Sequence, residues 1–157
     1  MLLNNVVRAT GLPPRKPIMP AFDVNKEEIN AFDFGETYLF TAYFDENQLF
    51  NQLEKYYNGD NYRFEVPEEN LKQVQQVLDN FFYELVVQES PEEYCIVLDK
   101  DITPASILKS SVVRKQRRSR EMFVMKDKTS LRQAVEQGAT PLEKSGISKG
   151  VLRWQID

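Results

Sequence analysis

The sequence contains no histidine, and this absence excludes more chemistry than any other feature of the composition. It removes Ser-His-Asp and Cys-His catalysis, histidine-ligated zinc and the commonest general base near neutral pH. There is one cysteine, Cys95, so neither an intramolecular disulfide nor a thiolate zinc site can form within one chain. The enzyme class left open is one whose catalytic groups are the carboxylates of aspartate and glutamate. We expect a binding protein rather than an enzyme.

Glycine and long apolar runs are also scarce. None of the six glycines belongs to a GxGxxG or Walker phosphate loop, and we expect no cofactor. No segment approaches the ~18 consecutive apolar residues of a membrane-spanning helix. The apolar N-terminal run is interrupted by asparagine and arginine, unlike a signal peptide. Since a single unpaired thiol also fits a reducing compartment, we expect a cytoplasmic protein that does not bind membranes.

What the chain has is ordinary globular composition with an uneven charge. Hydrophobic residues make up 41% of its 157 residues, enough for one domain with a real core. Residues 1–100 carry 8 basic and 18 acidic side chains, whereas residues 101–157 carry 12 basic and 6 acidic ones. Either the two parts face different surroundings, or the basic part covers the acidic part.

The region before residue 36 gives no regular pattern. Prolines 13, 14, 17 and 20 remove backbone donors and favour extended geometry. We therefore expect residues 1–35 to form a Pro-containing N-terminal arm and residues 36–157 to form a single α+β domain.

Strand and helix patterns alternate from residue 36 onward. The segment 37–44 is aromatic and β-branched, as in a strand, and 46–57 has apolar residues at helical spacing. Residues 62–66 alternate, with Tyr62, Phe64 and Val66 expected on one side. A helix over 68–81 begins after a proline and with two glutamates, which suit a helix N-terminus.

The order of the following segments predicts the fold. Strands are expected over 83–87, 94–99 and 121–126, with a helix starting at Pro104 after Thr103. Over 62–126 this is the βαββαβ order of a ferredoxin-like antiparallel sheet with both helices on one face. The 37–57 strand–helix unit would extend this sheet. At the other end of the chain, a helix over 131–137 with a capping box at Ser130 and an edge strand near Trp154 would complete it.

Ferredoxin-like domains have many functions, so the fold does not decide what this protein does. The third expected strand, EEYCIVLDKD, lacks the glycine and paired aromatics of RNA-recognition motifs. Aromatic residues around the turn at 58–61 are expected in the core, with a base-stacking surface as the alternative.

The strongest functional signal is the basic run within SSVVRKQRRSREMFVMKD, residues 110–127. The apolar stripe of the helix from Pro104 ends before this run, so we expect a projecting helix tip or a flexible loop. Arginine suits phosphate and carboxylate groups, and such contacts attach a protein to nucleic acid without reading its bases. The predicted nucleic-acid-binding residues, which would contact phosphates of DNA or RNA, are Arg114, Lys115, Arg117, Arg118 and Arg120.

Two alternatives stay open for this run. It could pair with an acidic surface, either on this chain or on a protein partner in an assembly, or it could be a solvated charged face. A homo-oligomer could also form through a sheet face or an edge strand, with Trp154 as an interface anchor.

Two further features are weaker candidates for chemistry. Asp99 and Asp101 stand at the end of a predicted strand, two residues apart, so both carboxylates could bind one Mg²⁺ ion, as in a metal-dependent enzyme. The more common role of aspartates at this position is to end a strand in a solvent-exposed turn. Cys95 is expected to be a buried structural thiol, because no cation or histidine nearby in sequence would activate it.

Overall fold

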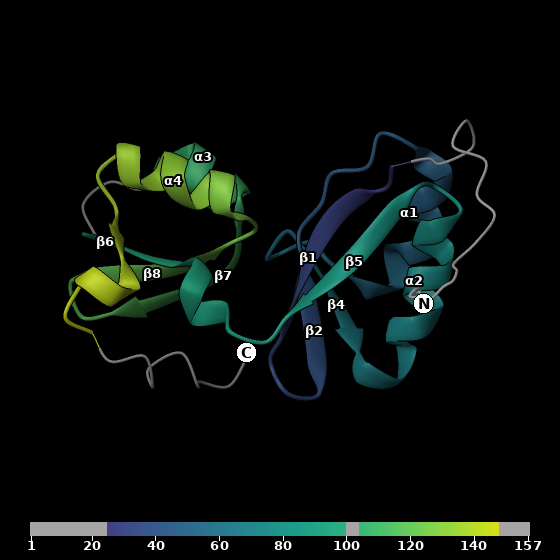
Figure 1. Cartoon of the computed structure of the whole chain (residues 1–157), viewed down its shortest axis with the longest axis horizontal. Helices are drawn as coiled ribbons and strands as arrows, with labels where there is room; N and C mark the ends of the chain where they lie inside the picture. Colours follow the sequence, from purple (N-terminus) through teal and green to yellow (C-terminus); the bar gives the residue numbers. More distant parts are fainter. Residues whose placement is uncertain (1–24, 100–103, 148–157) are drawn as a thin grey trace, which may run out of the picture.

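The computed structural model describes residues 25–99 and 104–147, which form two sheets, each packed against two α-helices (Figure 1). The first sheet and its helices come from residues 27–88, here called the N-terminal half. The second comes from residues 91–144, here called the C-terminal half. This combination of helices and mainly antiparallel strands confirms the α+β class that the sequence predicts. In the described part of the chain, no helix is both long and apolar enough to cross a membrane.

The N-terminal half consists of a five-stranded sheet and two α-helices. Its elements are β1 (Glu27–Asp33), β2 (Thr37–Phe40), α1 (Asn47–Leu53), a 3-10 turn (Glu54–Tyr56), β3 (Tyr57–Asn58), β4 (Arg63–Pro67), a 3-10 turn (Glu68–Asn70), α2 (Leu71–Asp79) and β5 (Tyr83–Gln88). The strand order is β3-β4-β2-β1-β5, with β1 and β5 parallel and the other pairs antiparallel. In Figure 1, α1 and α2 lie on the side of this sheet away from the C-terminal half.

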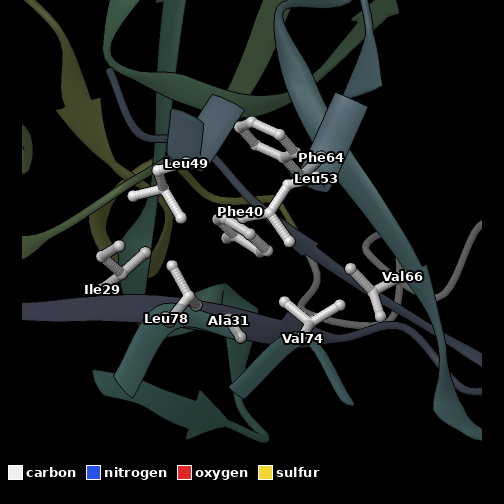
Figure 2. Packing of buried hydrophobic residues seen from close by; sticks show 9 residues of the cluster. All are labelled: Ile29, Ala31, Phe40, Leu49, Leu53, Phe64, Val66, Val74 and Leu78. Atoms are coloured by element: carbon white, nitrogen blue, oxygen red, sulfur yellow. The ribbon is translucent and has the colours of Figure 1, made fainter. Parts of the chain in front are cut away.

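The core of the N-terminal half lies between this sheet and its helices (Figure 2). Alternate residues of a strand point to opposite faces, and Ile29 and Ala31 of β1 therefore point toward the helices. Phe64 of β4 stacks on Phe40 of β2, with ring centroids 4.9 Å apart. The buried residues of this cluster are Ile29, Ala31, Phe40, Leu49, Leu53, Phe64, Val66, Val74 and Leu78.

The C-terminal half is a four-stranded sheet with two α-helices. Its elements are a 3-10 turn (Pro91–Tyr94), β6 (Cys95–Asp99), α3 (Ala105–Lys109), β7 (Ser111–Arg117), β8 (Arg120–Met125), α4 (Lys128–Glu136), β9 (Thr140–Pro141) and a 3-10 turn (Leu142–Lys144). The order is β7-β8-β6-β9, and every neighbouring pair is antiparallel. Ile96 and Leu98 of β6 and Phe123 and Met125 of β8 pack against residues of α3 and α4.

A third cluster of buried side chains joins the two halves. Phe32 of β1, which is fully buried, contacts the ring edge of Tyr94 with centroids 5.1 Å apart. Val112 and Val124 lie in the same cluster. Side chains of the N-terminal half also donate hydrogen bonds to main-chain carbonyls of the C-terminal half, so the junction is both apolar and hydrogen-bonded. These bonds are Asn30 Nδ2 to Lys126 O (2.9 Å), Thr41 Oγ1 to Ser111 O (3.3 Å), Tyr43 Oη to Lys109 O (3.0 Å) and Arg63 Nη1 to Val112 O (3.2 Å).

The pairing differs from the expected ferredoxin-like sheet, because the strands expected over 62–126 are divided between two sheets. Two strands that the sequence analysis did not anticipate explain the difference. Strand β1 lies between β2 and β5, inside the range 1–35 assigned to the arm, whose residues 1–24 lie outside the described residues. Strand β7 occupies the segment expected to continue a helix, and it pairs with β8.

Most of the other expected elements are present with shifted ends. The predicted helices over 46–57 and 68–81 correspond to α1 and α2, each with an adjoining 3-10 turn. Helix α4 is capped by Asp127, whose side chain accepts from Ser130 N at 2.7 Å, so Ser130 is not the capping residue. The C-terminal strand and Trp154 lie outside the described residues.

Candidate nucleic-acid interface

The predicted basic residues lie on a β-hairpin, and neither a helix tip nor a flexible loop is formed. Strands β7 and β8 are joined by Arg118 and Ser119 alone. Arg118 adopts a φ of 55°, which is uncommon for a residue with a side chain and is normally supplied by glycine or asparagine in such turns. The strand forms because it begins with the β-branched Val112 and Val113, and Val113 pairs with Val124 of the apolar strand β8.

Arg114 is committed to an interaction within the protein. Its Nε donates to Glu121 Oε2 at 2.8 Å, and its Nη2 donates to the same oxygen. Glu121 is only 2% exposed, whereas the Arg114 side chain is 49% exposed. Arg114 also lies over the ring of Phe123, 6.0 Å from the centroid. A buried carboxylate needs such a partner, so Arg114 is chiefly a structural residue.

The other basic positions gather around the turn. In the ladder, Arg117 is directly opposite Arg120, and like charges at such positions destabilise a sheet. Arg118 is exposed at the turn. Arg120 is half-buried, and its Nη2 donates to Ser145 O at 3.4 Å. Lys115 is half-buried and faces Met122 across the ladder. Of the described side chains at the turn, that of Arg118 is exposed and therefore best placed for an external anion, and the positions of Arg117 and Arg120 flank it in the ladder.

The edge strands β5 and β7 show features that hinder pairing with another chain. At β5, Gln75 of α2 acts like a neighbouring strand, because its Oε1 accepts from Leu85 N at 2.8 Å and its Nε2 donates to Tyr83 O at 3.4 Å. At β7, the Thr41 and Arg63 side chains bond two carbonyls, and a register irregularity follows Ser111. Bulges and basic residues protect edges in natural sheets, which is a second explanation for the basic residues of β7.

The ion pairs of the described residues bear on the alternative in which the basic part covers the acidic part. None of the four pairs identified joins the two halves, and Lys26 lies directly before β1: the pairs are Lys26–Asp79, Arg63–Glu65, Arg114–Glu121 and Lys126–Asp127. The hydrogen bonds that cross between the halves run to main-chain carbonyls. The junction thus depends on apolar packing and carbonyl acceptors more than on charge.

The two aspartates proposed as metal ligands are not brought together by any described contact. Asp99 is exposed at the end of β6, opposite Arg120 in the ladder, and Asp101 lies outside the described residues. Within residues 25–99 and 104–147 there is no group of three or more metal-ligating side chains.

Cys95 is buried in β6, as expected for a structural thiol. Burial raises the pKa of the Cys95 thiol to about 12, although a hydrogen bond with the Phe123 backbone acts in the opposite direction. The nucleophile and metal ligand is the thiolate, so a thiol with this pKa is unreactive near neutral pH.

The raised pKa of Cys95 makes folding stability dependent on alkaline pH. In the unfolded chain the thiol ionises near ~8.5, so between that pH and about 12 only the unfolded state releases the proton. The stabilisation is complete below pH ~8.5 and is lost as the pH rises. Between pH 8 and 9.5 we expect a loss of about 1 kcal/mol that Cys95→Ala does not show. Urea unfolding of both proteins at the two pH values measures it. The same pH dependence in both would exclude Cys95 as its cause.

The aromatic residues expected in one core cluster separate into buried and exposed ones. Phe64 is 1% exposed, whereas Tyr62 precedes β4 with a φ of 55° and is 62% exposed. Two exposed aromatic residues not singled out from the sequence are Tyr43 at 60% and Phe82 at 54%. No local pattern distinguishes them from the core phenylalanines and tyrosines around them.

All three exposed aromatic residues lie at one end of the first sheet, next to a cleft. Tyr43 follows the end of β2, and Tyr62 and Phe82 precede the starts of β4 and β5. Because β1, β4 and β5 run in one direction and β2 in the other, these positions share an end. The cleft there has a volume of about 240 Å³ and is lined by Glu27, Glu28, Ile29, Asn30, Thr41, Ala42, Tyr43, Tyr83, Lys126 and Asp127.

Comparison with known proteins adds no family to this description. No protein-family model, no curated protein and no solved structure matches this chain.

Proposed function

We propose that this protein binds nucleic acid through the sugar–phosphate backbone, using the tip of the β7–β8 hairpin. The observation that carries the proposal is the clustering of Arg117, Arg118 and Arg120 around a two-residue turn. A phosphate bound between the opposed Arg117 and Arg120 positions would relieve the repulsion between them. The protein contributes binding and no covalent chemistry in this proposal.

The chemistry of the side chains at the tip also supports the proposal. Arginine, with its planar fork of donors, binds phosphate oxygens through paired hydrogen bonds. The three residues carry no aromatic neighbour at the turn, so the contacts would attach the protein without reading bases. Arg114, which belonged to the sequence prediction, is left out because it serves Glu121.

The test is binding of labelled single- and double-stranded DNA and RNA by fluorescence anisotropy over a range of salt concentrations. The wild type should bind more weakly as salt rises, because binding releases counterions from the phosphates. The double variant Arg117→Gln, Arg118→Gln should lose affinity for all sequences alike. Its slope of log affinity against log salt should fall by about 2, roughly 1 for each lost contact.

A charge-matched control shows whether the effect belongs to the hairpin. The double variant Lys55→Gln, Lys72→Gln removes the same charge from the N-terminal half and should bind like the wild type. No binding to any nucleic acid at low salt would refute the proposal. Binding of polyglutamate in its place would refute it too and would favour an acidic protein partner.

A further inference from the structure

The cleft between the two halves has an acidic wall. Glu27 and Glu28, both exposed, come from the start of β1. In the parallel ladder, Glu28 lies directly opposite Glu84 of β5, and like charges so placed repel. Within the described residues neither Glu27 nor Glu28 has an ion-pair partner. A cation in the cleft would offset this repulsion.

The single basic side chain that lines the cleft is already matched by an acidic one. Lys126 Nζ lies 3.7 Å from Asp127 Oδ2, and both residues follow the end of β8. Subtracting this pair leaves Glu27 and Glu28 as the charged groups of the lining, so the cleft is negative. The pKa of Tyr83 agrees with this sign, since burial raises it and the nearby Glu27, Glu46 and Asp45 raise it further.

Two tyrosine rings complete the lining, and their positions are constrained. The Tyr43 hydroxyl donates to Lys109 O at 3.0 Å, which anchors the ring to the end of α3. The Tyr83 ring meets the Phe44 ring edge-on, with centroids 5.1 Å apart. Aromatic faces attract ammonium and guanidinium groups and also cover their aliphatic chains. Rings already held in place lose little conformational entropy when a ligand binds.

We propose that this cleft binds an organic cation, an alkylammonium or guanidinium group, through the ring of Tyr43 and the carboxylate of Glu28, which lies on the same face of β1 as Asn30, toward the C-terminal half. The volume of about 240 Å³ accommodates a linear aliphatic chain that carries such a group. The cation has two sources with the same chemistry, a free polyamine or the lysine or arginine side chain of a peptide. The cleft thus recognises positive charge, the opposite sign from the hairpin ligand.

The cleft and the hairpin tip are separate sites. Lys126 and Asp127 follow the end of β8, whereas Arg120 begins it. Six residues of strand span about 20 Å, and the two sites have no residue in common. Failure of nucleic-acid binding would therefore leave the cleft proposal standing, and the reverse is equally true.

The experiment is a titration of the full-length ¹⁵N-labelled protein, followed by ¹H–¹⁵N correlation NMR. The probes are 1,5-diaminopentane, spermidine and short capped peptides with one lysine or one arginine. Uncharged 1,5-pentanediol is the matched control. The amines or the peptides should produce saturable shifts at the amides of residues 27–30, 41–43 and 126–127, and the diol should produce none. Whichever probe binds more tightly identifies the source of the cation.

Variants assign the interaction to the named groups. Glu28→Gln and Tyr43→Leu should each raise the Kd by about fivefold. Tyr43→Phe keeps the ring but loses the hydrogen bond to Lys109 O, so its Kd should rise less than that of Tyr43→Leu. Glu136→Gln, an exposed carboxylate at the end of α4, should leave the Kd unchanged.

Three results would overturn the proposal. These are an absence of saturable shifts with every amine and peptide, equal shifts with the diol, and an unchanged Kd in Glu28→Gln. The NMR spectrum of each variant shows directly whether it is folded, so loss of binding through unfolding is recognised. If Tyr43→Leu does not fold, Glu28→Gln decides the proposal, because it changes an exposed side chain.

Discussion

Replacing Arg114 by alanine is expected to destabilise the protein by about 2–3 kcal/mol, although Arg114 belongs to a surface run of basic residues. The reason is Glu121, which is 2% exposed and would lose both donors of Arg114; Gln116 Nε2 approaches the same oxygen only at 3.5 Å, so the buried charge would be less well compensated. Half of the Arg114 side chain is exposed, so water can partly replace it and the effect should stay below that of a fully buried pair. Urea denaturation at neutral pH measures the change.

Two companion variants separate this cause from a general effect of lost charge. Arg118→Ala removes an exposed arginine from the same hairpin and should change stability by less than about 0.5 kcal/mol. The double variant Arg114→Met, Glu121→Leu replaces the pair by apolar side chains and should recover most of the loss. A loss no larger in Arg114→Ala than in Arg118→Ala would show that Glu121 does not depend on Arg114.

The structural role of Arg114 determines which variants can test nucleic-acid binding by the hairpin. A variant that neutralises the whole run from Arg114 to Arg120 would also destabilise the C-terminal sheet, so its loss of nucleic-acid binding would not be specific evidence for phosphate contacts. The hairpin proposal should therefore be judged on Arg117 and Arg118, with Glu121 still paired.

Replacing Phe32 by alanine should cost about 3–5 kcal/mol, the largest stability effect predicted here. Phe32 is fully buried where the two halves meet, against Tyr94, Val112 and Val124. Alanine would leave a cavity between two sheets, and both are held by their own helices and cannot easily close it. Against a typical total stability of 5–15 kcal/mol, this loss is a large fraction.

Denaturation followed by near-ultraviolet and far-ultraviolet circular dichroism tests the effect of Phe32→Ala and its meaning. Coincident transitions that shift together to lower denaturant would support the prediction of a single domain. The matched control is Phe82→Ala, a phenylalanine that is 54% exposed, and it should shift the midpoint only slightly. Equal shifts in both variants, or two separate transitions in the wild type, would contradict this account.

Local patterns in the sequence were sufficient for many elements of the fold. Helices α1, α2 and α4 and strands β4, β5, β6 and β8 were predicted with errors of a few residues at their ends. They follow from apolar spacing, β-branched and aromatic residues, prolines and turn residues, all of which act over a few neighbours. The burial of Cys95 was predicted on the same basis and is confirmed.

Strand pairing could not be predicted in this way, because hydrogen-bond partners in a sheet lie far apart in sequence. Strand β1, with two glutamates and an asparagine, lies in the range that gave no regular pattern in the sequence. It is central because its two faces have different surroundings. Ile29 and Ala31 face the core of the N-terminal half, whereas Glu28 lines the cleft and Asn30 donates to Lys126 O at the junction between the halves. Its pairing with β2 and β5 is the reason that one expected sheet became two.

The sequence by itself determined the α+β class, the absence of histidine chemistry and the concentration of positive charge after residue 113. The tertiary structure decided what each charge does. Arg114 is bound to a buried carboxylate, and the Arg117 and Arg120 positions are opposed across a ladder. Glu27 and Glu28 line a cleft with two tyrosines. The physical reason is that charge belongs to the residue, whereas pairing and burial depend on distant segments that meet only in the folded protein.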